Sequence, residues 1–133
     1  MSNQRILKGR IVGGAGEAAY FTELAWVQAQ CAEKLNFQPY PGTLNIEVDE
    51  DSLPILMELR AKPGIQLISP NPDFCHARSF KASLGKVAGA IIIPAEDVTI
   101  HGRRIVEMIA PLCLKETLSL AEGDRVEVLV EEA

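Results

Sequence analysis

Apolar residues along the chain recur mainly with the two-residue period of β-strands. The strongest such segments are rich in Ile, Leu and Val and are bounded by Gly, Pro, Asn or Asp, which favour turns. They predict strands at residues 5–12, 43–48, 65–69, 87–94 and 125–130. Two weaker candidates are residues 74–81 and 106–110. We therefore expect a chain rich in β-structure.

Helical spacing is confined to short segments. In residues 23–35, apolar positions recur every three or four residues, which predicts one amphipathic helix. This apolar stripe consists of Leu24, Val27, Cys31 and Leu35. Ser52 is expected to cap a second helix that ends near residue 60. A short third helix is expected at residues 114–120, before a turn at residues 122–124.

This mixture of elements restricts the fold class. Many short strands that do not alternate regularly with helices argue against a doubly wound sheet and favour a mainly β barrel with short helices. The length of 133 residues predicts a single domain over residues 1–133. Hydrophobic residues make up 47% and charged residues 23%, which is typical of a globular protein with a stable core.

Charge and cysteine content narrow the possible partners. A net charge of -5 counts against nucleic-acid binding, which needs an excess of Lys and Arg. Since no apolar run reaches the roughly 18 residues of a membrane span and no signal sequence is recognised, we expect no membrane partner and a cytoplasmic location. Cys31, Cys75 and Cys113 are odd in number and widely spaced, which favours reduced thiols packed in or near the core.

A glycine-rich segment at residues 14–19 follows the first predicted strand and matches the dinucleotide fingerprint Gly-x-Gly-x-x-Ala. A Rossmann unit also needs a helix directly after the glycines and an acidic residue about 20 positions further on, where this chain has Leu35-Asn36-Phe37. A Rossmann fold is therefore not expected. Two interpretations stay open: a turn that requires positive φ, or a loop whose backbone N–H groups approach a nucleotide phosphate.

A second distinctive segment leads into the strand at residues 43–48. Pro41 and Gly42 predict a sharp turn, after which Thr43 and Asn45 project from the same face of the strand. Two neutral oxygens at one point suit Mg²⁺, which keeps several waters and takes further ligands from substrate phosphates. The alternative is that both side chains hydrogen-bond the turn.

Four motifs occur in a specific order. They are Gly-Ala-Gly-Glu-x-x-Tyr-Phe at 14–21, Asn-Phe-Gln-Pro-Tyr-Pro-Gly-Thr-Leu-Asn-Ile at 36–46, Glu-Met-Ile-Ala-Pro at 107–111 and Leu-x-x-Gly-Asp-x-Val at 120–126. Over nearly its whole length the chain thus resembles the archaeal CTP-dependent riboflavin kinase family. The resemblance implies a six-stranded cradle-loop barrel that transfers the γ-phosphate of CTP to the 5′-hydroxyl of riboflavin, giving FMN and CDP.

The resemblance also implies roles for individual residues. Those expected to bind the nucleotide are Ala15, Gly16, Glu17, Ala18, Ala19, Tyr20, Leu112, Cys113, Leu114, Lys115, Glu116 and Thr117. Thr43 and Asn45 would hold Mg²⁺ between the β- and γ-phosphates, and Thr99 and Glu107 would contact the flavin. Alternation along its strand favours the solvent face for Glu107, whereas the resemblance favours the mouth of the barrel. Glu107 is the first candidate for a general base and Glu17 the second. The expected partners are riboflavin or FMN and CTP or CDP, with the protein as a monomer or small homo-oligomer.

The chain departs from the family pattern at two places. The usual Gly-Glu-Gly followed by a basic residue is replaced by Gly16-Glu17-Ala18-Ala19. The usual Leu-Arg becomes Leu114-Lys115, which keeps a positive charge but loses the planar, bidentate guanidinium group. Two alternatives to the kinase therefore stay open. One is a flavin- or nucleotide-binding module of the same fold without turnover, and the other is a transcription-regulator-like barrel, which the acidic charge disfavours.

Overall fold

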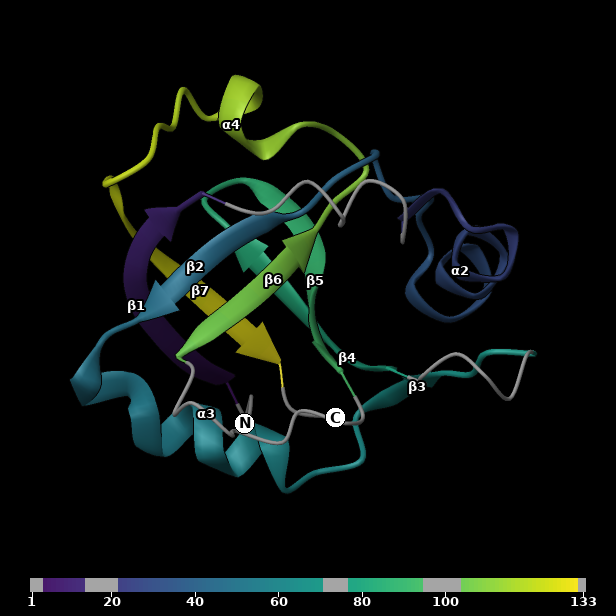
Figure 1. Ribbon diagram of the computed structural model, residues 1–133, viewed down its shortest axis with the longest axis horizontal. Helices are drawn as coiled ribbons and strands as arrows, with labels where there is room; N and C mark the ends of the chain where they lie inside the picture. Colours follow the sequence, from purple (N-terminus) through teal and green to yellow (C-terminus); the bar gives the residue numbers. More distant parts are fainter. Residues whose placement is uncertain (1–3, 14–21, 71–76, 95–103, 132–133) are drawn as a thin grey trace.

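The computed structural model describes residues 4–13, 22–70, 77–94 and 104–131, and its centre is an antiparallel β-barrel (Figure 1). The strands are β1 (Gln4–Val12), β2 (Leu44–Val48), β3 (Ile65–Leu67), β4 (Ala77–Leu84), β5 (Val87–Pro94), β6 (Ile105–Ile109) and β7 (Arg125–Glu131). They pair in the order β4-β5-β6-β2-β1-β7, and β7 pairs back onto β4, so that six strands form a closed ring. β3 pairs with β4 outside this ring. The expected mainly β barrel is confirmed.

Short helices surround the barrel. They are α2 (Ala25–Gln30), which continues as the π-helical η1 (Cys31–Leu35), the 3₁₀ turn η2 (Glu50–Ser52), which continues as α3 (Leu53–Arg60), and α4 (Leu114–Thr117). In Figure 1, α3 lies below one end of the barrel, α4 lies at the opposite end, and α2 lies to one side. None of the helices in the described ranges is long and apolar enough to cross a membrane.

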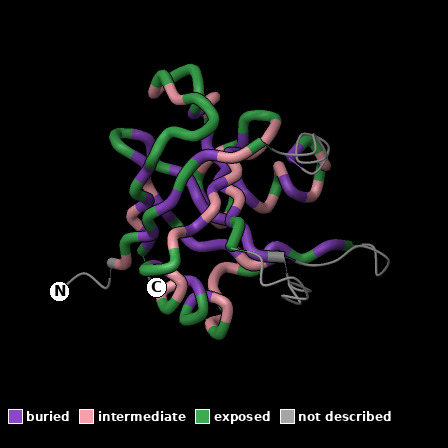
Figure 2. The backbone as a smooth tube through the Cα atoms, turned by 60° about the vertical axis from the view of Figure 1, so that its left-hand side comes forward, coloured by how far each residue is buried: buried purple, intermediate pink, exposed green. Residues whose placement is uncertain are grey.

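Alternating side chains fill the interior of the barrel. Along β2, Leu44, Ile46 and Val48 are buried, whereas the two residues between them, Asn45 and Glu47, are only half-buried. Along β7, buried Val126, Val128 and Val130 likewise alternate with more exposed residues, and Figure 2 shows how buried and exposed positions follow one another along the chain. Leu56 of α3 and Leu114 of α4 belong to the same core, so the two helices cover the two ends of the barrel.

β5 is apolar along its whole length because both of its faces are covered. Ile91 and Ile93 lie in the barrel interior. Ala90 and Ile92 point outward and pack with Val27 of α2 in a second, smaller core. A continuous apolar run is what burial on two faces requires. The helix α2 therefore covers the outer face of the sheet next to β6, which carries the candidate site.

The predicted strands differ from the observed ones mainly at their ends. The strand expected at residues 74–81 is instead Ala77–Leu84, which pairs with β5 from Ala77 opposite Pro94 to Leu84 opposite Val87. The long ladder with β5 extends it beyond Lys81, and residues 74–76 lie outside the described ranges. The strand expected at residues 65–69 is shorter, ending at Leu67.

The predicted helices are shorter or less regular than expected. The segment 23–35 is α-helical only up to Gln30 and then π-helical, and it ends at Asn36, whose φ of 66° suits an asparagine at a helix end. Ser52 occupies the N-cap position of α3 but makes no capping bond. Its hydroxyl accepts a hydrogen bond from the backbone N–H of Lys8 at 3.0 Å, so it joins the helix to the barrel. The third helix ends at Thr117.

The cysteines differ in their surroundings. Cys31 and Cys113 are both free thiols. Cys31 is buried as expected, and this burial raises the pKa of its thiol to about 11, so the thiol stays protonated at neutral pH. Cys113 is half-buried beside the core residue Leu114 and lines a surface pocket, so it lies near the core and not within it. Cys75 lies outside the described residues.

Gly89→Ala is expected to destabilise the barrel strongly. A Cβ atom at Gly89 on β5 would overlap the carbonyl oxygen of Ile109 on β6. Since backbone cannot move aside without shifting the strand, we expect a loss of about 3 kcal/mol in the free energy of unfolding, measured in urea. Gly13→Ala is the matched control, because a Cβ there would meet only the flexible carboxylate of Glu122. A loss below about 1 kcal/mol for Gly89→Ala would contradict this packing.

Candidate active site

Three polar side chains meet on the outer face of β2 and β6. Thr43 directly precedes β2, and the alternation of the strand directs Thr43 and Asn45 away from the core. Asn45 lies opposite Glu107 in the β2–β6 ladder. The hydroxyl of Thr43 donates toward Oε1 of Glu107 at 3.1 Å and lies 3.3 Å from Oδ1 of Asn45. Three half-buried oxygen-bearing side chains, from segments far apart in the sequence, therefore converge at one point.

Glu107 does not point into the mouth of the barrel, as the resemblance implied, but lies on the outer face of β6. Val106 and Met108 fill the barrel interior, so the alternation of β6 places Glu107 on the outer face and not toward the inside of the barrel. This outer face is not open solvent. The ladder partners of Glu107 are Asn45 on β2 and Ile92 on β5, and Ile92 is buried in the core beneath α2. The carboxylate thus lies between a polar cluster and apolar packing.

The oxygen cluster fits a magnesium ion. Mg²⁺ binds oxygen ligands octahedrally at about 2.1 Å, which places neighbouring ligand oxygens about 3 Å apart. The separations of 3.1 Å and 3.3 Å from the Thr43 hydroxyl agree with that spacing. Among the described residues, no group of three or more His, Cys, Asp and Glu side chains could hold a metal ion. The neutral oxygens of Thr43 and Asn45, beside the Glu107 carboxylate, are the group that could hold such an ion at this point.

A surface pocket of about 110 Å³ opens beside Thr43. One wall is the turn that leads into β2, and the other is the segment between β6 and α4. The lining residues are Tyr40, Pro41, Gly42, Thr43, Leu44, Met108, Ala110, Leu112, Cys113, Leu114 and Lys115. Thr43 belongs both to this pocket and to the cluster with Glu107. The pocket and the cluster are therefore adjacent parts of one site.

Only some of the expected nucleotide-binding residues line this pocket. Residues 112–115 line it, together with Thr43, whereas Glu116 and Thr117 are exposed on α4 and do not. The remaining expected site residues lie outside the described ranges: Ala15, Gly16, Glu17, Ala18, Ala19, Tyr20 and Thr99.

Tyr40 is a pocket residue to which the sequence analysis assigned no role. It is 44% exposed and lines the pocket, and its backbone N–H donates to the carbonyl of Ala110 at 2.7 Å. The signal for it in the sequence is an aromatic residue between two prolines, Pro39 and Pro41. Such a turn holds the ring away from the core, so it is available to a flat ligand.

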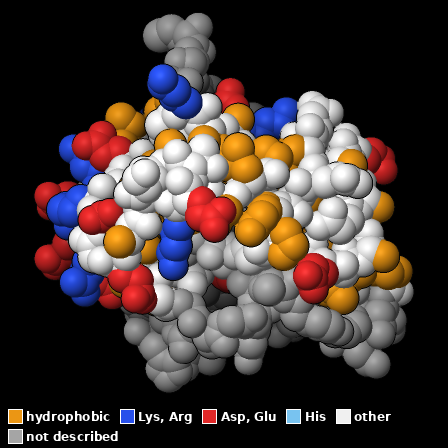
Figure 3. All heavy atoms as spheres, turned by 90° about the horizontal axis from the view of Figure 1, so that it is seen from above, with side chains coloured by type: hydrophobic (Ala, Val, Ile, Leu, Met, Phe, Trp, Pro, Cys, Tyr) orange, Lys and Arg blue, Asp and Glu red, His pale blue; other side chains and the backbone are white. Residues whose placement is uncertain are grey.

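Among the described residues, the end of the barrel that carries α4 has no uniform charge. Seen from this end, hydrophobic side chains are scattered over the centre and right of the described surface, and Lys and Arg side chains lie among Asp and Glu side chains, most of them at its left (Figure 3). On this part of the surface a phosphate group would meet local donors and not a broad positive surface. Lys115 is such a donor, because it is exposed and lines the pocket.

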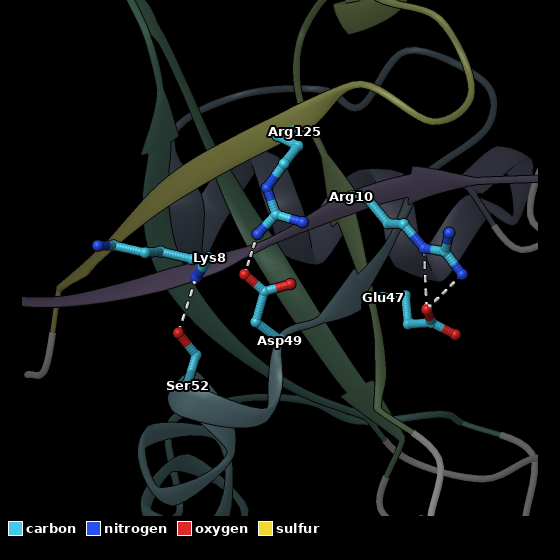
Figure 4. Close-up of polar contacts among 6 residues, drawn as sticks. All are labelled: Lys8, Arg10, Glu47, Asp49, Ser52 and Arg125. Atoms are coloured by element: carbon cyan, nitrogen blue, oxygen red, sulfur yellow. Dashed lines mark hydrogen bonds and ion pairs between the residues drawn. The ribbon is translucent and has the colours of Figure 1, made fainter.

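A second pocket, of about 490 Å³, lies at the other end of β2. Figure 4 shows two ion pairs among its lining residues: Arg10 binds Glu47, and Arg125 binds Asp49. The Arg10 and Glu47 side chains are 56% and 36% exposed, and exposed ion pairs contribute at most about 1 kcal/mol each. Because none of the expected site residues is among its described lining residues, this pocket is the weaker candidate.

Comparison with known proteins identifies the family. The family model CTP-dep_RFKase, described as "Domain of unknown function DUF120", matches residues 11–130. The chain belongs to this family. Thr43, Asn45 and Glu107, together with the pocket beside them, all lie within the matched residues.

Several relatives of this chain carry the name "Riboflavin kinase". The protein of Pyrobaculum islandicum is 39% identical over 129 residues, which cover 92% of this chain and 58% of the relative. That of Archaeoglobus fulgidus is 35% identical over 127 residues, covering 93% of this chain and 54% of the relative. For Ignicoccus hospitalis the identity is 38% over 127 residues, covering 93% and 70%. The chain therefore spans little more than half the length of the first two relatives.

Proposed function

We propose that the chain is a riboflavin kinase that uses CTP as its phosphate donor. The observation that carries the proposal is the position of Thr43, which lines the pocket and also bonds to Glu107. A phosphate donor in the pocket would thereby be next to a carboxylate that can receive a proton. The names of the relatives support riboflavin as the acceptor, and the family name supports CTP as the donor.

In this proposal the pocket holds the phosphates of CTP beside Thr43 and Lys115. Thr43 and Asn45 would hold Mg²⁺, which would offset the negative charge of the bound phosphates. Lys115 lines the same pocket and adds a positive charge within it. Phosphoryl transfer needs mainly in-line placement and neutralised charge, and these residues would supply both.

Glu107 is proposed to act as the general base. The 5′-hydroxyl oxygen of riboflavin forms a bond to the γ-phosphorus, and the hydroxyl proton passes to the carboxylate. The bond between the γ-phosphorus and the oxygen that bridges to the β-phosphate breaks, and CDP leaves with that electron pair. The hydrogen bond from Thr43 holds the carboxylate at the edge of the pocket. The products are FMN and CDP.

CTP is expected to give faster FMN formation than ATP, GTP or UTP. The two expected nucleotide-binding segments, residues 15–20 and 112–117, resemble the CTP-using family apart from Ala18, Ala19 and Lys115. The sequence also has no Walker-type Gly-Lys-Ser/Thr loop, which commonly binds ATP or GTP phosphates. Mass spectrometry of the chain with riboflavin, Mg²⁺ and each nucleotide separately measures this preference. Equal or faster FMN formation with ATP would overturn the donor assignment and leave the kinase assignment in place.

A flavin- or nucleotide-binding module without turnover is the second candidate. The observation that favours it is Ala18-Ala19, where the family usually has a glycine and a basic residue. A methyl group at residue 18 narrows the approach of a phosphate, and Ala19 removes a cation. The same assay separates the two candidates, because a binding module would retain riboflavin and form no FMN with any nucleotide.

A further inference from the structure

The turn that leads to Thr43, residues 39–42, is attached to the helical region around α2 by two side chains. The hydroxyl of Thr22 accepts a hydrogen bond from the backbone N–H of Gly42 at 2.8 Å. The side-chain amide of Gln28 donates to the carbonyl of Pro39 at 3.1 Å and to the carbonyl of Thr22 at 2.5 Å. An amide nitrogen has two N–H groups, so Gln28 can bond to Pro39 of the turn and to Thr22 at the same time.

The turn is also attached on its other side. The N–H of Tyr40 donates to the carbonyl of Ala110, which follows β6 and lines the opposite wall of the pocket. Gly42 has a φ of 109°, a conformation that a glycine adopts readily and other residues do not. The backbone that directly precedes Thr43 is therefore held from two directions in a particular conformation.

The Thr22 side chain is buried, although it carries a polar hydroxyl group. Thr22 is fully buried, and a buried hydroxyl costs free energy unless it is hydrogen-bonded. A valine would fill the same volume without that cost. One feature that valine lacks is the acceptor for the backbone N–H of Gly42, the residue next to Thr43. In the sequence, Thr22 lies only two positions after Tyr20, the last residue of the expected nucleotide-binding segment. Its hydrogen bond with Gly42 therefore links the turn to a residue next to that segment.

We propose that Thr22 and Gln28 are positioning residues that fix the place of Thr43 by holding the 39–42 turn. The inference rests on the proposed function, because it assigns them to the site that binds nucleotide and Mg²⁺. Neither residue needs to touch a substrate. Their effect follows from geometry, since a displacement of about 1 Å at a reacting site can cost about 100-fold in rate.

Thr22→Val and Thr22→Ser together test this role. Thr22→Val removes the hydroxyl and keeps the shape, so we expect kcat to fall roughly 10- to 100-fold and the half-saturating Mg²⁺ concentration to rise, with little change in the KM for riboflavin. Thr22→Ser keeps the acceptor and should remain close to wild type in both quantities. Equal losses in both variants, or wild-type behaviour of Thr22→Val, would overturn the proposal.

Amide NMR spectra give a readout that does not depend on turnover. In wild type, Mg²⁺ with CDP should shift the amide signals of Thr43 and Asn45. Thr22→Val should displace the Gly42 amide signal and weaken those shifts, and Thr22→Ser should not. If the Gly42 amide signal and the shifts of Thr43 and Asn45 in Thr22→Val equal those of wild type, the positioning role is overturned, whether or not the wild-type chain forms FMN. A wild-type chain that shows these shifts and forms no FMN contradicts only the proposed function.

Gln28→Met covers the case in which Thr22→Val does not fold. Gln28 is only half-buried, so methionine should be tolerated while the bonds to Pro39 and Thr22 are lost. We expect the same rise in the Mg²⁺ requirement and a smaller fall in kcat. A wild-type Mg²⁺ requirement together with a wild-type kcat in Gln28→Met would contradict the proposal.

Discussion

Asn45→Ala is expected to lower the rate of FMN formation by roughly 100- to 1,000-fold, which corresponds to several kcal/mol of lost metal-dependent stabilisation of the transition state. The side chain projects from the outer face of β2 and its oxygen lies beside the Thr43 hydroxyl, so it contributes little to the core. We therefore expect the free energy of unfolding to change by less than about 1 kcal/mol. Steady-state kinetics over a range of Mg²⁺ concentrations, together with urea unfolding, measure both quantities.

Glu47→Ala is the matched control for Asn45→Ala. Glu47 lies two residues further along the same face of β2 and pairs with Arg10 in the second pocket. It should keep nearly wild-type turnover. An Asn45→Ala variant that unfolds would instead indicate a structural role for the side chain, and one with normal activity would exclude Asn45 as a metal ligand.

Glu107→Gln is expected to slow phosphoryl transfer roughly 100- to 10,000-fold while riboflavin still binds. Glutamine has the same shape and can still accept the hydrogen bond from Thr43, but it cannot take up the proton of the riboflavin hydroxyl. The loss should therefore appear in kcat and leave the affinity for riboflavin largely intact. Quenching of riboflavin fluorescence measures the affinity, and FMN formation measures the rate.

Glu127→Gln provides the control for Glu107→Gln, because Glu127 is an exposed acid on β7. It should not change either quantity. Wild-type affinity and rate in Glu107→Gln would place the general base elsewhere and leave the flavin site unassigned. A loss of affinity equal to the loss of rate would indicate that Glu107 binds riboflavin without acting as a base.

Much of the fold could be predicted from local pattern. The continuous apolar run at residues 87–94 is β5, and it is apolar throughout because α2 covers its outer face. The alternation along residues 43–48 correctly placed Thr43 and Asn45 on one face. The register between strands could not be predicted in the same way. The pairing of Asn45 with Glu107 joins residues far apart in the sequence, and alternation within each strand does not specify it.

Contacts made by tertiary packing explain the remaining differences. The outward direction of Glu107 depends on which face of β6 packs inside the barrel, and its flanking residues are apolar on both faces. Ser52 occupies a helix N-cap position in the sequence, yet its hydroxyl bonds to Lys8 of β1. Thr22 bonds to Gly42 across 20 positions of sequence. None of these contacts leaves a local signal, because each partner lies on a different element.

The most direct test of the central claim follows the γ-phosphate itself. The chain is incubated with riboflavin, Mg²⁺ and CTP that carries a radioactive γ-phosphate, and the products are separated and counted. The account predicts label in FMN and one CDP released for each FMN formed, since the γ-phosphorus moves directly to the riboflavin hydroxyl. No labelled FMN, or label released only as inorganic phosphate while riboflavin stays unmodified, would contradict it.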